Sequence, residues 1–391
     1  MENRTVDVAI IGGGVMGPSV AYHLLSQGLC QSVALFEQDP MHMHSSTGLS
    51  AGGIRHLFSS AVNIALATFS VRFYEQFAQH MATEAGPGPD VAFRRNGYLF
   101  LLDRQNEESL LRRADFQERE GVELERLDRA ALKDRFPEIE VGDLQGGVFG
   151  VRDGFLDPYQ VMRGFTQKAQ ELGAQFITER AEAVEVEAGC AVAVRSAGWR
   201  VAARLAVVNA AGAWAGDVGR MAGVEVPVVP RSRQVYQVIP PSAAFDRYPL
   251  TIDPTGFYFR PETGGRVLVG KSFDDDPRDF VWDWKRNLFL DAIWPDLAAR
   301  VPVMENLRLE SGWAGLYEVT PDDNAIIGPH PDLERFYVIA GFSGHGMMQG
   351  PAAGLALAER ICLGSYRSVD ASGLELRRFA EGREYREDAI V

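Results

Sequence analysis

The stretch VDVAIIGGGVMGPSVAYHLLSQ, residues 6–27, decides the fold of this chain. Its first six residues, VDVAII, are mostly apolar and β-branched, which is typical of a buried strand. Four glycines follow, and the periodic apolar residues after them predict a helix that ends near Gly28. A second apolar run, VALFE at 33–37, completes a strand–helix–strand unit. Such a unit places its two strands parallel in one sheet.

Three of the glycines have the spacing G-x-G-x-x-G at the start of the predicted helix. Gly12 turns the chain, Gly14 lets a pyrophosphate approach the backbone at the helix N-terminus, and Gly17 lets helix and strand pack closely. Glu37 closes the next strand twenty residues after Gly17. Its carboxylate can accept both ribose hydroxyls and disfavours a 2′-phosphate. The pattern in this context predicts a dinucleotide site.

Composition excludes several classes of protein. The 391 residues include 46% hydrophobic ones, enough for a large core in two or three domains. Thirty-nine basic against fifty-three acidic residues give a net charge of -14, so we expect no nucleic-acid partner. No apolar run is long enough for a membrane span. The apolar N-terminal run contains glycines and has acidic flanks, so we interpret it as part of the fold rather than as a secretory signal.

Cysteine and histidine spacing argues against a metal site or a disulfide framework. Cys30, Cys190 and Cys362 are an odd number without a Cys-x-x-Cys pair, which indicates reduced thiols and a cytoplasmic protein. His42 and His44 form an H-x-H pair, but no acidic residue or cysteine has companion spacing. We therefore expect no metal.

The remaining chain predicts an α/β domain that a second domain interrupts twice. Near residue 97 the run GYLFLL is strand-like and a charged amphipathic helix follows it. Short alternating runs between about 224 and 310 predict an antiparallel sheet. A helix near the end of the chain has Pro351 in its first turn. The predicted domains comprise residues 1–85, 144–223 and 311–391 for nucleotide binding, and residues 86–143 and 224–310 for an α+β substrate domain.

The glycine-rich segments to which the first domain returns favour FAD over NAD. NAAGAW at 209–214 and GFSGHGM at 341–347 each follow a predicted strand. Backbone amides at such strand-to-helix turns supply positive potential, which suits an anionic reduced flavin. Nicotinamide enzymes usually have a separate catalytic domain after one contiguous nucleotide unit.

Six motifs in order resemble the glycine oxidase, sarcosine oxidase and dimethylglycine dehydrogenase group of FAD-dependent amine oxidoreductases, in the D-amino-acid-oxidase-like superfamily. They are VAIIGGGVMG with Glu37, SSTGLSAGGIRHLFS, VVNAAGAWAGDV, GFYFRPETGG, GLYEVTPDDNAIIG and GFSGHGMMQGPAAG. The resemblance covers nearly the whole chain. It implies a glutathione-reductase-like FAD domain of Rossmann type, with the antiparallel sheet of the substrate domain over one face of the flavin ring.

The same resemblance leaves two alternatives open. The run GGIRHLFS is also similar to a subgroup that contains a mitochondrial FAD-binding assembly factor of a respiratory complex. A flavoprotein with little turnover is therefore the second interpretation. A member of the superfamily that oxidises 2-hydroxy acids is the third.

The family pattern places FAD along a defined set of residues. The ADP half would lie on the first strand–helix turn, and the serine–glycine run at 45–53 would follow the pyrophosphate and flavin edge. The backbone of residue 184 would meet the adenine. The expected FAD-binding residues are Gly12, Gly14, Val15, Met16, Gly17, Glu37, Gln38, Ser45, Ser46, Gly52, Gly53, Val184, Ala211, Gly212, Trp214, Gly344, His345, Gly346, Met347 and Met348.

The resemblance also implies a reaction. The C–N bond of an amino acid or N-substituted amino acid is oxidised by hydride transfer from the substrate C–H to flavin N5, and the imine is then hydrolysed. Arg55 falls at the family's carboxylate-binding arginine, although a surface arginine that caps a loop is the alternative. Met348 stands where sarcosine oxidases have a second, lysine ligand. We therefore expect substrates with a longer apolar substituent than glycine or sarcosine.

Three further residues are candidates for the substrate side of the flavin. Tyr258 and Tyr317 match positions that line the site, although Tyr258 could instead fill the core of the sheet. His345 is expected to donate a hydrogen bond near the reduced flavin, with a structural loop histidine as the alternative. An oxygen-activating lysine of related oxidases would fall near Leu268, with Lys271 close by, so the electron acceptor is oxygen or another molecule.

The family pattern predicts that FAD is bound without a covalent link. Covalent attachment in this superfamily requires a cysteine or a histidine that touches the ring. The two corresponding positions are Gly315 and Leu49, and neither side chain can form that bond.

Overall fold

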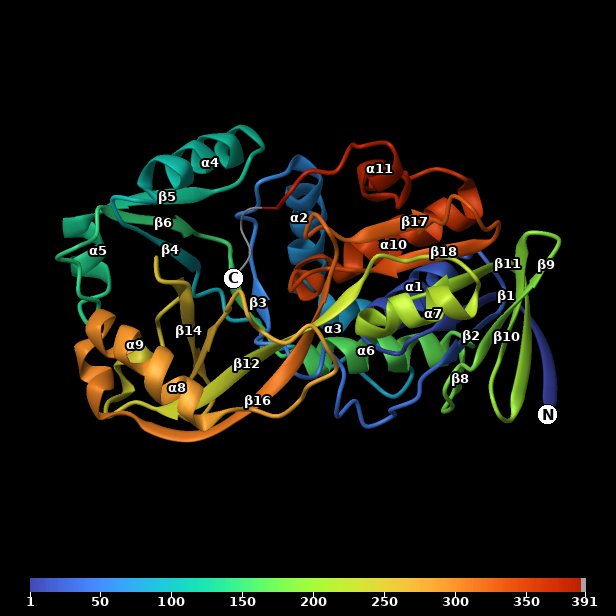
Figure 1. Cartoon of the computed structure of the whole chain (residues 1–391), viewed down its shortest axis with the longest axis horizontal. Helices are drawn as coiled ribbons and strands as arrows, with labels where there is room; N and C mark the ends of the chain where they lie inside the picture. Colours follow the sequence, from blue (N-terminus) through green and yellow to red (C-terminus); the bar gives the residue numbers. More distant parts are fainter. Residues whose placement is uncertain (388–391) are drawn as a thin grey trace.

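The computed structural model describes residues 1–387 and builds them around two eight-stranded sheets. Figure 1 shows one sheet in each half of an elongated molecule, with β1 and β11 in one half and β4, β12 and β14 in the other. The predicted α/β class is confirmed.

The first sheet has the order β17-β18-β11-β1-β2-β8, and β10 and β9 extend it from β11. Its strands are β1 (Glu2–Ile11), β2 (Val33–Phe36), β8 (Gln175–Ile177), β9 (Ala183–Glu187), β10 (Cys190–Arg195), β11 (Trp199–Asn209), β17 (Ile326–Pro329) and β18 (Phe336–Ala340). β1 pairs in parallel with both β2 and β11. Val8 and Ile10 enter one core cluster and Ala9 and Ile11 the other. Both faces of β1 are therefore buried, which explains its continuously apolar sequence.

Helices cover both faces of this sheet. α1 (Met16–Ser26) packs against α6 (Pro158–Glu171) and α10 (Gly346–Leu363), and α10 packs against α2 (Ala61–Glu75). α7 (Ala215–Met221) lies against β11 and β9, on the side of the second cluster. The remaining short elements of this half are α3 (Phe77–His80), α11 (Arg377–Ala380), and the two-stranded pair β3 (Gly53–Ile54) and β7 (Gly154–Phe155).

The position of Pro351 differs from the prediction. Pro351 does not lie in the first turn of its helix, because α10 already begins at Gly346. A proline inside a helix has no N–H for the carbonyl four residues earlier, which here is that of Met347. The hydroxyl of Tyr74 donates to this carbonyl over 2.7 Å. A side chain of α2 thus replaces the missing backbone donor.

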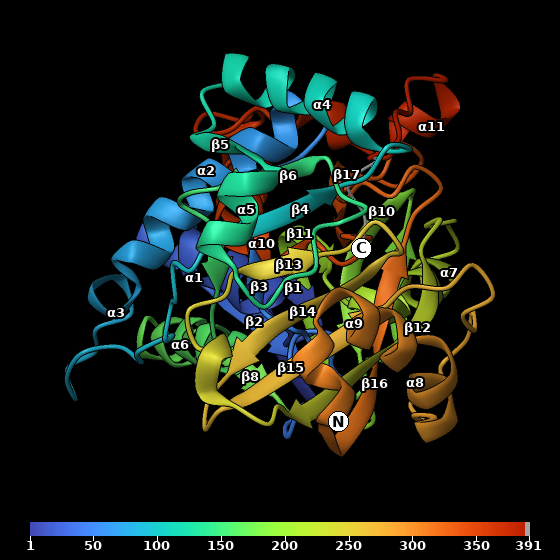
Figure 2. The same ribbon diagram turned by 90° about the vertical axis from the view of Figure 1, so that its left-hand side faces the viewer.

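The second sheet has the order β16-β12-β15-β14-β13-β4-β6-β5. Its strands are β4 (Tyr98–Leu102), β5 (Leu124–Asp128), β6 (Gly146–Gly150), β12 (Val229–Ile239), β13 (Leu250–Ile252), β14 (Phe257–Glu262), β15 (Arg266–Lys271) and β16 (Arg308–Val319). Figure 2 shows α8 (Arg286–Ala292) and α9 (Trp294–Arg300) in front of this sheet, with α4 (Glu107–Arg119) along its upper edge and α5 (Arg129–Arg135) beside β5 and β6. Phe257 and Phe259 enter the cluster under α8 and α9, whereas Tyr258 packs against the cluster of the first half. The alternation of β14 therefore turns Tyr258 toward the first sheet.

Two strands lie in a different sheet from the one that the predicted boundaries give them. β6 and most of β16 fall in the ranges 144–223 and 311–391, but β6 pairs with β4 and β5, and β16 pairs with β12. These pairings form between segments far apart in the sequence, so composition does not reveal them. We propose correspondingly later boundaries for both returns to the nucleotide-binding domain.

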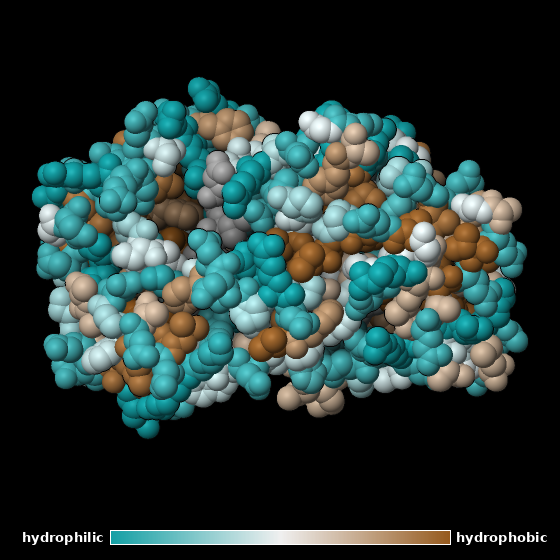
Figure 3. Space-filling view, in the orientation of Figure 1, coloured by the Kyte–Doolittle hydropathy of each residue, from teal (hydrophilic) through white to brown (hydrophobic). Residues whose placement is uncertain are grey.

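The face of the molecule shown in Figure 3 is predominantly polar. Hydrophilic residues cover most of the face in Figure 3, in keeping with the net charge of -14. Within residues 1–387, the helices are all too short or too polar to cross a bilayer.

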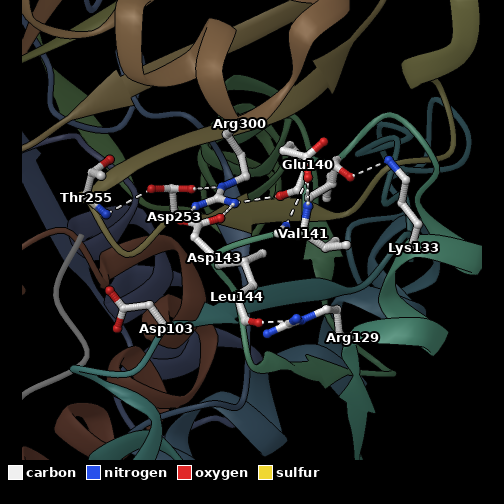
Figure 4. A network of polar contacts seen from close by, with 12 residues as sticks. Asp103, Arg129, Lys133, Glu140, Val141, Asp143, Leu144, Asp253, Thr255 and Arg300 are labelled. Carbon is white, nitrogen blue, oxygen red and sulfur yellow. Dashed lines mark hydrogen bonds and ion pairs between the residues drawn. The ribbon is translucent and has the colours of Figure 1, made fainter.

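A buried arginine ties together three segments of the second half (Figure 4). Arg300, at the end of α9, donates to Asp253 over 2.6 Å and to both carboxylate oxygens of Asp143 over 2.7 and 2.8 Å. It also donates to the backbone carbonyl of Glu140 over 2.6 Å. The guanidinium therefore connects α9 to the loop before β6 and to the turn after β13.

We expect Arg300→Met to destabilise the protein by about 3–5 kcal/mol, because the change leaves the buried carboxylate of Asp253 without its cation. Urea denaturation followed by circular dichroism measures the loss. Arg308→Met is the control, because the side chain of Arg308 is 72% exposed and 3.9 Å from Glu310. That control should cost less than about 1 kcal/mol, and equal losses in the two variants would contradict the role of the network.

Candidate active site

A cavity of about 700 Å³ is lined by residues of both sheets. Ile11, Phe36 and Ala210 contribute from the ends of β1, β2 and β11, and Val235 and Tyr258 contribute from the second sheet. In open α/β sheets, ligands bind beyond the carboxyl ends of the parallel strands, and this cavity has that position.

The glycines of the first turn have distinct spatial roles. A Cβ on Gly12, whose φ is +113°, would lie 2.2 Å from the carbonyl oxygen of Ala210, and one on Gly17 would lie 1.9 Å from that of Gly12. A Cβ on Gly14 would have only the hydroxyl of Thr47, at 3.4 Å, within 4 Å. The fold itself thus requires glycine at 12 and 17. At 14 a side chain would instead occupy the cavity.

Glu37 lies at the same end of the cavity. Its carboxylate accepts from the backbone N–H of Gly13 and of Asp39, each over 2.6 Å. These bonds hold the carboxylate beside the glycine turn and leave lone pairs for other donors. The geometry fits the ribose of a dinucleotide.

Most of the expected cofactor-binding residues line this one cavity. They are Gly12, Gly14, Val15, Met16, Glu37, Gln38, Ser45, Ser46, Gly52, Gly53, Ala211, Gly212, Trp214, Gly344, Gly346, Met347 and Met348. Gly17 lies behind the turn. Val184 is buried within the β9–β10 pair, opposite Val194, and Glu179, Arg180 and Ala181 line the cavity instead.

Three tyrosines line the other end, Tyr98 buried and the other two half-buried. Tyr98, Tyr258 and Tyr317 come from β4, β14 and β16. Burial raises the pKa of each phenol, that of Tyr98 to about 12. The phenols are therefore neutral near pH 7. Such a wall can exclude water and donate hydrogen bonds, but it does not supply a base.

The glycine loop before α10 touches this tyrosine wall. Gly344 has φ +92°, and a Cβ there would lie 2.5 Å from the ring of Tyr317. A Cβ on Gly346 would lie 3.2 Å from the side chain of Met16, at the start of α1. The N-termini of α1 and α10 thus meet beside the cavity, where both helix dipoles favour negative charge.

Arg55 and His345 lie together, outside the set of residues that line the cavity. Arg55 is 1% exposed and donates to the carbonyl oxygen of Leu57 over 3.1 Å. Its other terminal nitrogen is 3.2 Å from Nε2 of His345. A guanidinium only donates, so Nε2 accepts this bond. The structure therefore joins Arg55 to His345, whereas the expected placement of Arg55 was against the substrate.

The cavity also contains Arg233 and Trp282, which sequence reasoning did not assign to it, and Lys271, which lies close in sequence to the expected oxygen-activating lysine. Arg233 on β12 and Lys271 on β15 are cations of the second-sheet wall. Trp282 lines the cavity with its ring stacked on Trp214 at 6.2 Å and in edge contact with His44 at 4.6 Å. Alternation along a strand would place Arg231 and Arg233 on one face, and only the folded chain shows that Arg233 lines the cavity and Arg231 does not.

A model of the family described as FAD dependent oxidoreductase matches residues 7–360. The chain belongs to this family. The relation that the six sequence motifs predict is thereby confirmed, and the donors at the glycine turn fit FAD.

Known relatives cover almost the whole chain. It is 33% identical to the FAD-dependent oxidoreductase domain-containing protein 1 of Bos taurus, over 98% of this chain and 87% of that protein. It is 30% identical to the mitochondrial sarcosine dehydrogenase of Homo sapiens, over 96% of this chain and 41% of that protein. The solved structure of L-proline dehydrogenase from P. horikoshii matches with a TM-score of 0.89 and 26% identity, over 98% of this chain and 100% of that one.

A buried carboxyl group of this flavoprotein lines the cavity. Glu318 lines it next to Tyr317, and its carboxylate accepts from the backbone N–H of Gly341 over 3.0 Å. Burial raises the pKa of Glu318 to about 7, although hydrogen bonds from the N–H groups of Gly341 and Phe342 lower it. The family motif does not predict the raised pKa of Glu318, because that rise comes from burial in the folded chain.

We expect the stability of the cofactor-free protein to fall as pH rises from about 5 to 8. The folded pKa of Glu318 lies above its usual value, so folding is favoured by its proton below the unfolded pKa, and this contribution disappears as pH passes 7. The loss is on the order of 3 kcal/mol. Urea denaturation across this range measures it. Glu318→Gln should flatten the dependence and Glu305→Gln, at an exposed site, should keep it; equal slopes in both variants would refute the assignment.

Proposed function

We propose that the chain uses FAD to oxidise the C–N bond of an amino acid or an N-substituted amino acid. The supporting observation is the single cavity that extends from the G-x-G-x-x-G turn to the tyrosine wall of the second sheet. A dinucleotide on the turn would reach that wall with its far end. The names of two relatives, sarcosine dehydrogenase and L-proline dehydrogenase, give the substrate class.

Residues at one end of the cavity would bind the cofactor, and residues at the other end would contact the substrate. Gly14 and Glu37 would hold the ADP half, and the joined N-termini of α1 and α10 would stabilise negative charge. When bound, FAD supplies the two-electron redox chemistry. The neutral tyrosines would keep water from the substrate and favour an uncharged amine, which is the form that gives up its C–H hydrogen. Met348, 6% exposed, would contact an apolar substituent.

The reduced flavin would pass its electrons to an acceptor. Lys271 lines the cavity with its ammonium 2.7 Å from Asp296, and Leu268 is buried and is not among the lining residues. Oxygen or another acceptor would reoxidise the flavin.

The three cysteines are free thiols, which supports a reducing compartment such as the cytoplasm.

Anaerobic titration of the flavin tests the proposed reaction. We expect an amino acid with a longer apolar substituent, either a larger N-alkyl group or a ring, to bleach the flavin absorption faster than glycine or sarcosine does, because Met348 offers apolar contact. Dithionite serves as the control that the bound flavin is reducible. If dithionite bleaches it and no amine or amino acid in the panel does, the proposal is wrong and a flavin-binding role without turnover, or a hydroxy-acid substrate, takes its place.

We also propose that FAD is held without a covalent bond. Gly315 and Leu49, the two positions at which relatives attach the ring, lie side by side in the cavity: a Cβ on Gly315 would be 3.1 Å from the Cβ of Leu49. Neither residue has a nucleophile. After acid precipitation the yellow colour should stay in the supernatant, and the intact protein should have the mass of the bare chain. A yellow pellet with added flavin mass would contradict this.

A further inference from the structure

We propose that Arg233 is the residue that binds the carboxylate of the substrate, in the place that sequence comparison gives to Arg55. This inference rests on the proposed function and names the group that selects its substrates. It makes Arg233 a specificity-determining residue on the second-sheet wall.

Arg233 lies where a substrate carboxylate would meet the tyrosine wall. It lies on β12 opposite Gly315 of β16 and lines the cavity with Tyr258 and Tyr317. Its guanidinium carbon is 5.5 Å from the centre of the Tyr317 ring. A carboxylate on Arg233 would therefore lie against the tyrosine wall, where a substrate has to sit beside the flavin. Arg55 is instead joined to His345, outside the lining residues.

Some of the N–H donors of the Arg233 guanidinium have partners within the described part of the chain, and one buried donor has none there. One terminal nitrogen, Nη1, is paired with the carboxylate of Asp276 and donates to the carbonyl oxygen of Phe273 over 3.1 Å. Nε is buried, and residues 1–387 supply it with no hydrogen-bond acceptor. A buried donor without an acceptor is costly. Within residues 1–387, Nε of Arg231 is also buried without an acceptor, but only Arg233 lines the cavity, so the unpaired Nε of Arg233 together with its position points to a ligand. Nε and Nη2 form the edge of the guanidinium that binds a carboxylate through two parallel hydrogen bonds.

Asp276 holds the guanidinium of Arg233 in place. Its carboxylate also accepts from the backbone N–H of Phe273 over 2.9 Å, and Asp276 is 8% exposed. The other cation of this wall, Lys271, has Asp296 as its partner. Each cation is thus balanced by one carboxylate before a ligand binds. Such a wall suits a substrate with one carboxylate better than a dicarboxylate.

Binding of a simple carboxylate to the flavin-loaded protein tests the inference without turnover. Sodium propionate is titrated at constant ionic strength, the change in visible flavin absorption gives the Kd, and propionamide, of the same shape without charge, is the ligand control. We expect Arg233→Met to raise the Kd for propionate roughly 10- to 150-fold, as for a lost charged hydrogen bond. Propionamide should perturb the flavin weakly and equally in all variants.

Two further variants make the result specific. Arg231→Met is the matched control: Arg231 lies two residues earlier on β12 and donates to the carbonyl oxygens of Phe273 and Asp274, outside the cavity lining. It should leave the Kd within about twofold of the unmodified protein. Arg233→Lys keeps the cation and loses the two-point geometry. Arg233→Lys should raise the Kd for propionate roughly 3- to 10-fold. If Arg233→Met loses its flavin, Arg233→Lys replaces it as the test variant.

The outcomes separate this inference from the proposed reaction. A higher Kd in Arg55→Met with an unchanged Kd in Arg233→Met would overturn it, as would a propionate titration that leaves the flavin spectrum of the unmodified protein unchanged. If propionate binds through Arg233 and no amino acid bleaches the flavin, the carboxylate site stands and the proposed reaction fails. If amino acids bleach the flavin of Arg233→Met with unchanged KM, the reaction stands and the inference fails.

Discussion

The close contact between helix α1 and the glycine turn before it is the constraint on which the cavity depends. Gly17 approaches the carbonyl oxygen of Gly12 so closely that a Cβ would overlap it. A second contact of this kind brings α10 against α1, where the hydroxyl of Ser19 donates to the carbonyl oxygen of Gly350 over 2.9 Å and a Cβ on Gly354 would be 2.2 Å from that hydroxyl. Small residues thus let two helices begin at the same point.

This convergence explains how backbone groups can hold an anion beside the glycine turn. Two helix N-termini direct unpaired N–H groups and partial positive charge toward one region. A negatively charged pyrophosphate or ring needs no arginine there. The cations that line the substrate end, Arg233 and Lys271, come from the other sheet and already have carboxylate partners.

The second sheet gives the site its chemical character through alternation. Successive residues of a strand face opposite sides, so Phe257 and Phe259 pack under the helices while Tyr258 faces the cavity. The three tyrosines give that wall neutral, largely apolar rings, and Met348 of α10 also lines the cavity. Against such a wall a single guanidinium with a free edge has a large effect on which ligands bind, because charge is poorly screened there.

The sequence by itself determined the nucleotide fold and the family, because both depend on residues that are close together in the chain. Glycine spacing, an acid at the end of the next strand and six short motifs carry their signal locally. Only the tertiary structure decided which residues face the cavity. The family motif singles out Arg55 and carries no signal for Arg233. Their different surroundings arise from contacts with His345 and with Asp276, residues distant from Arg55 and Arg233 respectively in the chain. The same holds for β6 and β16, whose sheet is set by pairing partners, and for Glu318, whose raised pKa comes from burial between segments that meet only in the folded chain.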